Sequence, residues 1–425
     1  MKLKRKGHDS GTNWQGPSLS RLISSWDRPL LMIVTLLLLI GLLMVFSATM
    51  FYAPDGGSQP DPLGTMMNHY LMIIVGVIIG ILASLIPDSW YRNPHLLMVG
   101  LTVLMVLLVV VHFFGQEVNG ARAWLPPIAS LSFQPSEFAK IGFCLSWAWI
   151  FDHILRERIL SKEVGQVNYI LALGFLMVIN GVLIFIQPDL GMTAIILGML
   201  LLMFLVFMNS KRWTLTTLAV LMGLFLFGNS LGQPVFDFLK QSSLRGMHLV
   251  QRIIAFIDPF EVAQDEGFQI VNGYLAFSRG GWFGQGIGQG QAKLGSAGFI
   301  PSIHNDYIFA NIVEELGFIG GVVVLGLLLA LIVRLLMLAA RPSNDRFGRF
   351  VIVGVASLFF VQTFANIGGV LGLVPLTGVT LPFVSYGGTS MLVNLLALFL
   401  AMKFASPAST PKHQVSLVYS REEGD

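Results

Sequence analysis

The feature that most constrains this chain is a series of long apolar runs, such as Leu30 to Val45, that no charged residue interrupts. About 20 apolar residues in a helix cross a hydrocarbon core about 30 Å thick, because each residue rises about 1.5 Å. A β-barrel would instead show short alternating segments. Only 12% of the residues are charged and 54% are hydrophobic, whereas a soluble domain carries about twice that charged fraction. The sequence therefore predicts an all-α polytopic membrane protein.

Ten segments qualify as transmembrane helices. They cover residues 29–50, 70–87, 95–114, 137–153, 169–187, 190–208, 213–229, 307–338, 347–374 and 388–404. We expect them to form one membrane domain, 29–404, with tails at 1–28 and 405–425. Lys and Arg favour cytoplasmic loops, and an inside N-terminus puts 19 of the 26 basic residues on that side. Both termini are therefore predicted to be cytoplasmic.

One outer connection, residues 230–306, is far longer than the others and holds five of the seven remaining basic residues. Connections of this length are usually functional or disordered, and its aromatic residues argue against disorder. Residues 249–257 and 268–277 are predicted to form short helices that lie in the membrane interface. Because membrane orientation explains where the basic residues fall, the net charge of +3 does not indicate a nucleic-acid partner.

Ionisable residues within or beside spans are expensive in lipid and are candidates for a functional site. Glu137 and Lys140 are three residues apart at the start of the fourth span, so they share a helix face and can pair. The pair could line a cavity or only neutralise a helix end. Asp189 and Asp306 each precede an apolar helix, where an aspartate could equally act as an N-cap.

Asp306 has further polar neighbours in sequence. His304 precedes it by two residues, and Glu314 and Glu315 follow within the eighth span. At 100° per residue, Glu314 lies about 80° around the helix from Asp306, and Glu315 lies on about the opposite side. We therefore expect Glu314 to share a cavity with Asp306, and Glu315 to serve helix packing or a backbone contact.

Two glycine- and proline-rich segments remain. Residues 280–290 contain six glycines but lack the Gly-Lys-Ser/Thr ending of a nucleotide loop. This segment could approach a phosphate or sugar, or could be a plain hinge. Residues 375–390, which include Ser385, interrupt an apolar region with Pro, Gly and hydroxyl groups. Irregular backbone at membrane depth is tolerated only beside protein or water, so we expect a re-entrant or cavity-lining segment.

Taken together, several of these segments resemble the shape, elongation, division and sporulation (SEDS) family, to which FtsW, RodA and SpoVE belong. The resemblance runs from about Asp27 to Lys403. It rests on Gln134 to Lys140, Gln187 to Gly191, Asp258-Pro259 with Gly267-Phe268-Gln269, His304 to Ala310 with Glu314 to Gly317, and Leu381 to Gly388.

The resemblance implies a bundle of ten transmembrane helices with a long extracellular loop between helices 7 and 8. It also implies a peptidoglycan glycosyltransferase of the bacterial cell membrane, which polymerises lipid II on the outer side. A class B penicillin-binding protein, which is a transpeptidase, is the implied partner, alongside other division proteins and membrane lipid. By motif, the catalytic aspartate falls on Asp306, and the cavity-lining pair falls on Glu137 and Lys140.

Five further residues complete the predicted substrate-binding set: Asp189, Arg279, His304, Glu314 and Ser385. The leaving diphosphate needs cations, which could be Lys140 and Arg279 or a divalent ion (Mg²⁺ or Mn²⁺) held near Asp306. The sequence departs from the family pattern twice. Arg122 comes one residue early before Trp124, and Ser302 replaces an acidic residue.

Alternatives to a division polymerase remain open. An elongation polymerase would use the same chemistry, and we favour the division role from the basic N-terminal tail and from residues 277–293. A lipid II flippase would use the same cavity and charges but needs two access states. A non-catalytic scaffold for division proteins would need no carboxylates in a cavity.

Overall fold

The computed structural model describes residues 24, 26–51, 61–118, 121–128, 131–160, 167–217, 219–220, 234–239, 248–264, 267–294, 299–301, 303–343 and 345–406. In these residues, nine helices are long and apolar enough to cross a membrane. They are α2 (Arg28–Thr49), α3 (Pro62–Leu85), α5 (Pro94–Phe114), α6 (Pro135–Leu160), α7 (Val167–Ile186), α8 (Leu190–Met208), α12 (Ile308–Ala339), α13 (Arg346–Val370) and α14 (Gly388–Ala405). An all-α polytopic membrane protein is thereby confirmed. Residues 221–229 of the predicted seventh span lie outside the described residues, so that span stays a prediction.

Several spans begin at a polar cap followed by proline. Asp27 accepts a hydrogen bond from Leu30 N at 3.1 Å, and Asp61 accepts one from Gly64 N at 2.8 Å. Each cap satisfies an amide that has no partner inside the helix, and proline at the first helical position needs no such partner. The cap at Asp61 starts α3 eight residues before the predicted position 70. Hydropathy missed these turns because their polar residues made the segment look like a loop.

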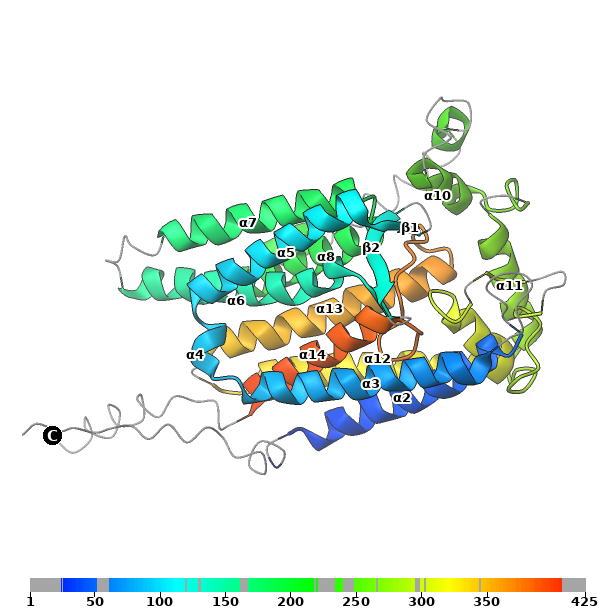
Figure 1. Ribbon diagram of the computed structural model, residues 1–425, viewed down its shortest axis with the longest axis horizontal. Helices are drawn as coiled ribbons and strands as arrows, with labels where there is room; N and C mark the ends of the chain where they lie inside the picture. Colours follow the sequence, from blue (N-terminus) through cyan, green and yellow to red (C-terminus); the bar gives the residue numbers. More distant parts are fainter. Residues whose placement is uncertain are drawn as a thin grey trace, which may run out of the picture.

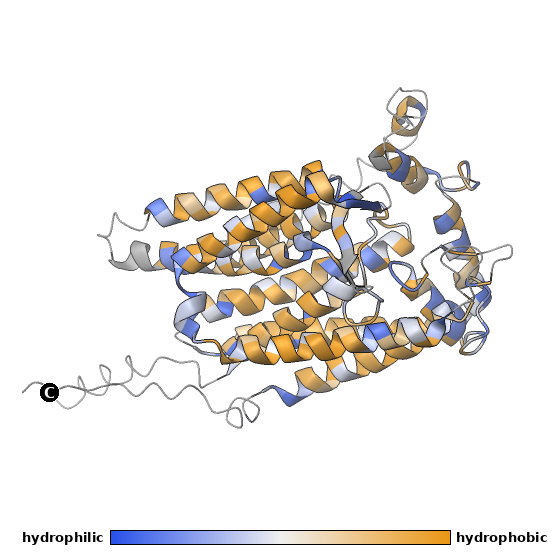
Figure 2. Cartoon of the chain, in the orientation of Figure 1, coloured by the Kyte–Doolittle hydropathy of each residue, from blue (hydrophilic) through white to orange (hydrophobic). Residues whose placement is uncertain are grey.

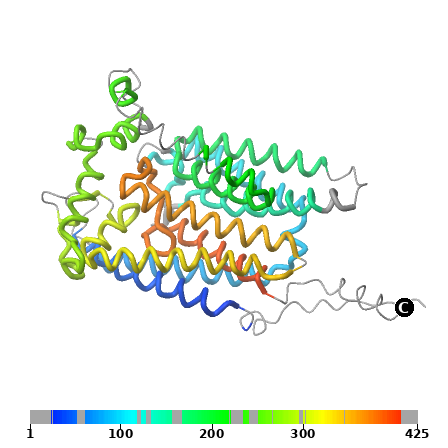
Figure 3. Tube along the Cα trace, turned by 180° about the vertical axis from the view of Figure 1, so that it is seen from behind, coloured from blue at the N-terminus to red at the C-terminus, as the bar shows by residue number. Residues whose placement is uncertain are grey.

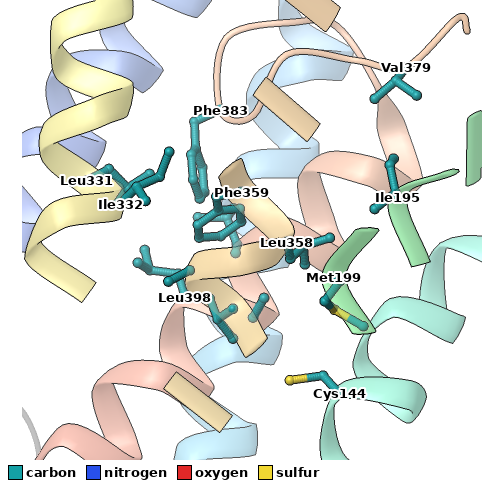
Figure 4. Packing of buried hydrophobic residues seen from close by; sticks show 14 of the residues in the cluster. Cys144, Ile195, Met199, Leu331, Ile332, Leu358, Phe359, Val379, Phe383 and Leu398 are labelled. Carbon is teal, nitrogen blue, oxygen red and sulfur yellow. The ribbon is translucent and has the colours of Figure 1, made fainter. Parts of the chain in front are cut away.

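The spans lie side by side, and their apolar residues cover most of the bundle's length (Figures 1 and 2). α13 is the most enclosed span, with 83% of its apolar window buried, whereas α5 and α7 bury 22%. It contacts α12, α14, α6 and α8. Figure 4 shows Phe359 of α13 against Phe383, with ring centroids 5.1 Å apart. α13 is therefore the central helix of the bundle, and the surrounding helices pack against it.

Irregular elements gather at one end of the bundle, opposite the short helix α4 (Asp88–Tyr91) (Figures 1 and 3). Helices α10 (His248–Ile257) and α11 (Phe268–Gly280) lie there, close to the predicted short helices. An antiparallel sheet with strand order β1-β2-β3 lies at the same end, formed by Gln116–Val118, Ala121–Ile128 and Leu131–Phe133. The sequence did not predict this small sheet, because β1 and β3 have only three residues each and the longer β2 contains Pro126 and Pro127, which argue against a strand.

α12 is interrupted at Gly317, whose φ of 75° is not helical. The glycine-rich segment 280–290 fills the gap. Gln285 N and Gly286 N donate to the carbonyls of Glu314 and Glu315, both at 3.0 Å. A side chain at position 317 would collide with the Trp282 carbonyl, so only glycine fits this conformation. Between the two predicted roles of the segment, these contacts favour a structural turn.

Candidate active site

A cleft of about 340 Å³ opens at the irregular end of the bundle. Six chain segments meet around it: β1 and β2, the start of α6, the turn before α8, α10, the turn before α12, and residues 377–390. Its polar lining comprises Gln116, Gln134, Glu137, Asp189, Arg252, Asn305, Asp306, Thr377, Thr380, Tyr386 and Ser390. The cleft therefore brings together three of the carboxylates predicted from sequence.

The two carboxylate oxygens of Asp189 accept hydrogen bonds from different elements. Oδ1 accepts from Met192 N at 3.0 Å, which confirms the N-cap interpretation for α8. Oδ2 accepts from the Gln134 amide at 2.8 Å and from the Ser136 hydroxyl at 3.3 Å, and both donors flank the start of α6. Burial raises the pKa of Asp189. This residue consequently joins the α8 turn to α6 and still lines the cleft.

Glu137 and Lys140 form a buried ion pair, with 2.6 Å between Lys140 Nζ and Glu137 Oε2. Their spacing of three residues on α6 predicted this contact, which is confirmed. Lys140 itself is fully buried and does not line the cleft, whereas Glu137 does. A buried carboxylate at this position would be costly without a cation behind it, so the contact with Lys140 offsets the cost of placing Glu137 at the wall of the cleft.

Asp306 lies in the turn before α12 and lines the cleft. It is not the N-cap, because Tyr307 occupies that position and makes no capping side-chain bond. Burial raises the pKa of Asp306 to about 6, against smaller lowering contributions from its own N–H, from Arg252 and from Tyr307 N–H. A carboxylate with such a pKa is ionised at neutral pH and is a stronger base than an exposed aspartate.

Two amides of α13, one helical turn apart, hold the backbone around Asp306. The Asn366 amide donates to the Asp306 carbonyl at 2.8 Å and to the Val379 carbonyl at 2.7 Å. The Gln362 amide donates to the Thr380 carbonyl at 3.0 Å. These bonds tie two walls of the cleft to the central helix. Sequence analysis missed both residues because it searched the spans only for ionisable side chains.

His304 and Ser385 are close to the cleft but do not belong to its described lining. His304 is buried, burial lowers its pKa to about 4, and its ring meets that of Tyr386 edge-on at 5.5 Å. The Ser385 hydroxyl accepts a hydrogen bond from Leu381 N at 2.8 Å within its own loop. Both residues shape the segment that presents Tyr386, so a direct contact with substrate, as predicted, has no support from their placement.

Glu314 and Arg279 also lie away from the cleft, contrary to the prediction that Glu314 shares a cavity with Asp306. Arg279 Nε lies 2.6 Å from Glu314 Oε1, and Ala292 N donates to Glu314 Oε2 at 3.0 Å. Glu315 pairs with Lys293 and accepts from the Ser47 hydroxyl at 2.6 Å. The helical phase was counted from Asp306, which precedes the helix, and this explains the error.

With this geometry in place, sequence comparison becomes decisive. Residues 28–409 match the family of bacterial proteins described as "Cell cycle protein", which groups FtsW, RodA and SpoVE. The chain belongs to this family. It is 31% identical over 379 residues to the probable peptidoglycan glycosyltransferase FtsW of Nitrosomonas europaea, covering 89% of this chain and 92% of that protein. It is 32% identical over 382 residues to the probable peptidoglycan glycosyltransferase FtsW of Bacillus subtilis, covering 89% of this chain and 90% of that protein.

Solved structures agree with the family fold. One chain, from a structure described as "Structural coordination of polymerization and crosslinking by a peptidoglycan synthase complex", has a TM-score of 0.63 and 25% identity, covering 90% of this chain and 98% of that one. The rod shape determining protein RodA of Thermus thermophilus has a TM-score of 0.59 at 24% identity, covering 90% and 97%. This second likeness concerns the fold alone.

The two departures from the family pattern fall differently. The Arg122 side chain is half exposed, lies 3.8 Å from Glu117 Oε2 and is absent from the described lining of the cleft, whereas Trp124 belongs to it. A substrate contact by Arg122 therefore has no support in this arrangement. Ser302, where the family carries an acidic residue, lies outside the described residues.

Proposed function

We propose that this chain is a peptidoglycan glycosyltransferase that polymerises lipid II, with Asp306 as its catalytic base. The observation that carries the proposal is the placement of Asp306 at the wall of a polar cleft that Glu137, Asp189 and Arg252 also line, where burial raises the pKa of Asp306 to about 6. The names of the FtsW relatives support the reaction class. A general base is most effective when its pKa lies near the working pH.

The stereochemistry of the reaction demands such a base. Lipid II carries an axial diphosphate on its MurNAc, and the glycan product is β-1,4 linked, so the anomeric carbon must invert. One displacement achieves this when a base removes the proton from the attacking hydroxyl. Asp306 takes the proton of the acceptor GlcNAc 4-hydroxyl as its oxygen attacks the anomeric carbon. As the new bond forms, the bond from the anomeric carbon to the diphosphate breaks, and undecaprenyl diphosphate leaves.

Negative charge develops on the leaving diphosphate, and a cation stabilises it. Arg252 is the basic residue in the described lining of the cleft, and it replaces Arg279 as our candidate because Arg279 is paired with Glu314. The described residues contain no group of three or more His, Cys, Asp or Glu able to hold a metal. A divalent ion would therefore depend on one or two carboxylates, such as Asp306, together with substrate phosphates, as Mg²⁺ often does.

The placement in the cell follows the basic residues of the loops. Both termini are cytoplasmic, and the cleft faces the outside of the cell membrane. The partner is a class B penicillin-binding protein, in keeping with the peptidoglycan synthase complex that contains the structural relative. We assign the chain to septal synthesis with other division proteins, since it is 31–32% identical to FtsW relatives.

The test is polymerisation of purified lipid II by the reconstituted chain, with and without its cognate transpeptidase. Asp306→Asn keeps the size of the side chain and removes the base, so we expect turnover to fall by about 10³-fold or more. Glu117→Gln is the matched control, because Glu117 is an exposed carboxylate at the same end and is not part of the described lining. It should polymerise like the wild type.

Three results would contradict the proposal. Full activity of Asp306→Asn would remove Asp306 from the role of base. Failure of the wild type under every condition, with lipid II still translocated across vesicle membranes, would point to a flippase. A wild type that neither polymerises nor translocates lipid II, yet binds division proteins, would point to a scaffold.

A further inference from the structure

A second cavity, of about 410 Å³, lies at the other end of the bundle, where α12 and α14 end and α13 begins. Its apolar lining comprises Leu338, Ala339, Pro342, Ile352, Phe404 and Ala405. Its polar lining comprises Arg341, Ser343, Asp345, Arg349 and Ser406. The cavity thus combines an apolar floor with two arginines, and the glycosyltransferase reaction proposed above makes no use of it.

The depth of this cavity follows from the length of α12. From Phe318, just after the break, to Ala339, the helix rises about 33 Å at about 1.5 Å per residue. That length is close to the thickness of a hydrocarbon core, about 30 Å. Since the break lies at the end that carries the cleft, the cavity falls at the level of the lipid headgroups on the opposite surface.

The acidic residues beside the cavity already have partners. Asp27 is held by both Nε and Nη2 of Arg334, at 2.9 and 2.7 Å, and Arg341 lies farther away, 3.5 Å from Asp27 Oδ2. Asp345 lies 2.7 Å from Arg92 Nη2 and caps α13 through Gly348 N at 3.0 Å. The nearby negative charge is therefore compensated before Arg341 is counted.

The two arginines of the cavity keep most of their hydrogen-bonding capacity. The Arg341 side chain is 52% exposed. Arg349 is exposed, and its guanidinium donates a hydrogen bond to the Ser343 carbonyl at 2.8 Å. A guanidinium has five N–H donors in a planar fork, which matches the oxygens of a phosphate. Two such forks above an apolar floor form a site for an amphipathic anion.

We propose that this cavity binds the headgroup phosphate of an anionic phospholipid. Arg341 and Arg349 contact the phosphate, and the apolar floor receives the glycerol and the first carbons of the acyl chains. Basic pockets between transmembrane helices at the membrane surface are suited to such lipids. The same arginines would attract free phosphate, but only a lipid would use Phe404 and the other apolar lining residues.

The experiment measures binding of phosphatidylglycerol to the full chain in neutral detergent by native mass spectrometry, with phosphatidylcholine for comparison. Arg341→Gln combined with Arg349→Gln should weaken phosphatidylglycerol binding about tenfold and leave phosphatidylcholine unchanged. Ala405→Phe, which fills the cavity without changing charge, should also weaken it. Inorganic phosphate at millimolar concentration should not displace the lipid.

Arg346→Gln is the matched control, because it removes a charge from the same end of α13 outside the described lining. Arg346→Gln could weaken binding as much as the double variant of Arg341 and Arg349, or Ala405→Phe could bind the lipid like the wild type. Either result would mean that diffuse attraction to the basic surface, and not the proposed site, holds the lipid. Displacement by inorganic phosphate alone would make it a free-phosphate site. Thermal unfolding of each variant in detergent identifies those that fail to fold. If the double glutamine variant fails to fold, Arg341→Lys with Arg349→Lys replaces it. This variant retains the charge but loses the planar guanidinium groups, so it should bind phosphatidylglycerol with intermediate affinity.

Discussion

Two groups of carboxylates lie at the same end of the bundle and differ in how their charge is compensated. Glu314 and Glu315 are fully buried, and each meets a cation and at least one backbone N–H. Asp306 lines a cleft, and no salt bridge joins it to a cation within the described residues. A buried carboxylate that is fully paired is inert, whereas one left partly uncompensated keeps its affinity for a proton. The comparison separates a group that holds the fold from one that can do chemistry.

The largest effect should come from removing a cation that pairs with Glu314 or Glu315. Lys293→Met leaves Glu315 buried without its cation, and removing one partner of a buried pair costs about 3–5 kcal/mol. We expect a large drop in the thermal unfolding temperature in detergent. Adding Glu315→Gln should recover part of the loss, because no uncompensated charge then remains. A double variant that is as unstable as the sum of the two single variants would show that the pair does not act as a unit.

A smaller effect should come from the α13 amides. Asn366→Leu removes two hydrogen bonds that place the Asp306 and Val379 carbonyls. We expect turnover to fall about 10–100-fold while lipid II affinity changes less than about threefold, since a small misplacement of a catalytic group can cost that much. Asn180→Leu is the control: its amide also bonds two backbone carbonyls, those of Leu101 and Leu176, away from the cleft.

Equal losses of turnover in the two leucine variants would mean that Asn366 matters only for stability. Asn366→Gln, which retains the donor, should recover activity in part. If turnover depends on Asn366 alone while stability depends on both Asn366 and Asn180, Asn366 has a positioning role beyond its contribution to the fold.

The last effect concerns the free energy of unfolding, which the burial of Asp306 lowers. Burial favours its protonated form, so above pH 6 the native state bears the cost of ionising it. Asp306→Asn should therefore stabilise the protein by up to about 3 kcal/mol at pH 7.5, because burial raises the pKa from about 4 to about 6 and each pKa unit corresponds to about 1.4 kcal/mol. The gain should decline as the pH falls through 6 and vanish below the unfolded pKa of about 4. Unfolding measured from pH 4 to 8 tests this, and a gain independent of pH would contradict it.

Sequence predicted those features that depend on neighbours along the chain. Residues 190–208 match α8, because a continuous apolar run between polar turns leaves few other choices. The Glu137–Lys140 pair follows from helix periodicity, and the cap at Asp189 follows from the position of an aspartate before an apolar helix. Each is a local consequence of one or two turns of chain.

Features that depend on distant segments could not be predicted. Glu314 was assigned to the wrong cavity because residues 306 and 307 are not helical, so the angle counted from Asp306 had no meaning. The contact of Asn366 with the carbonyls of Asp306 and Val379 joins three separate segments. Polar amides four residues apart in an apolar span were a usable signal, and a search that included Gln362 and Asn366 would have found them.

The interruption at Gly317 makes α12 a jointed element instead of a single rod. Its outer section, from Ile308 to Leu316, is joined to the turn that carries Asp306, and its inner section runs through the bilayer. The backbone of residues 280–290 lies at this break and forms hydrogen bonds with both sections. A displacement of the glycine-rich segment would therefore act on both sections of α12 and, through the outer section, on the turn that carries Asp306.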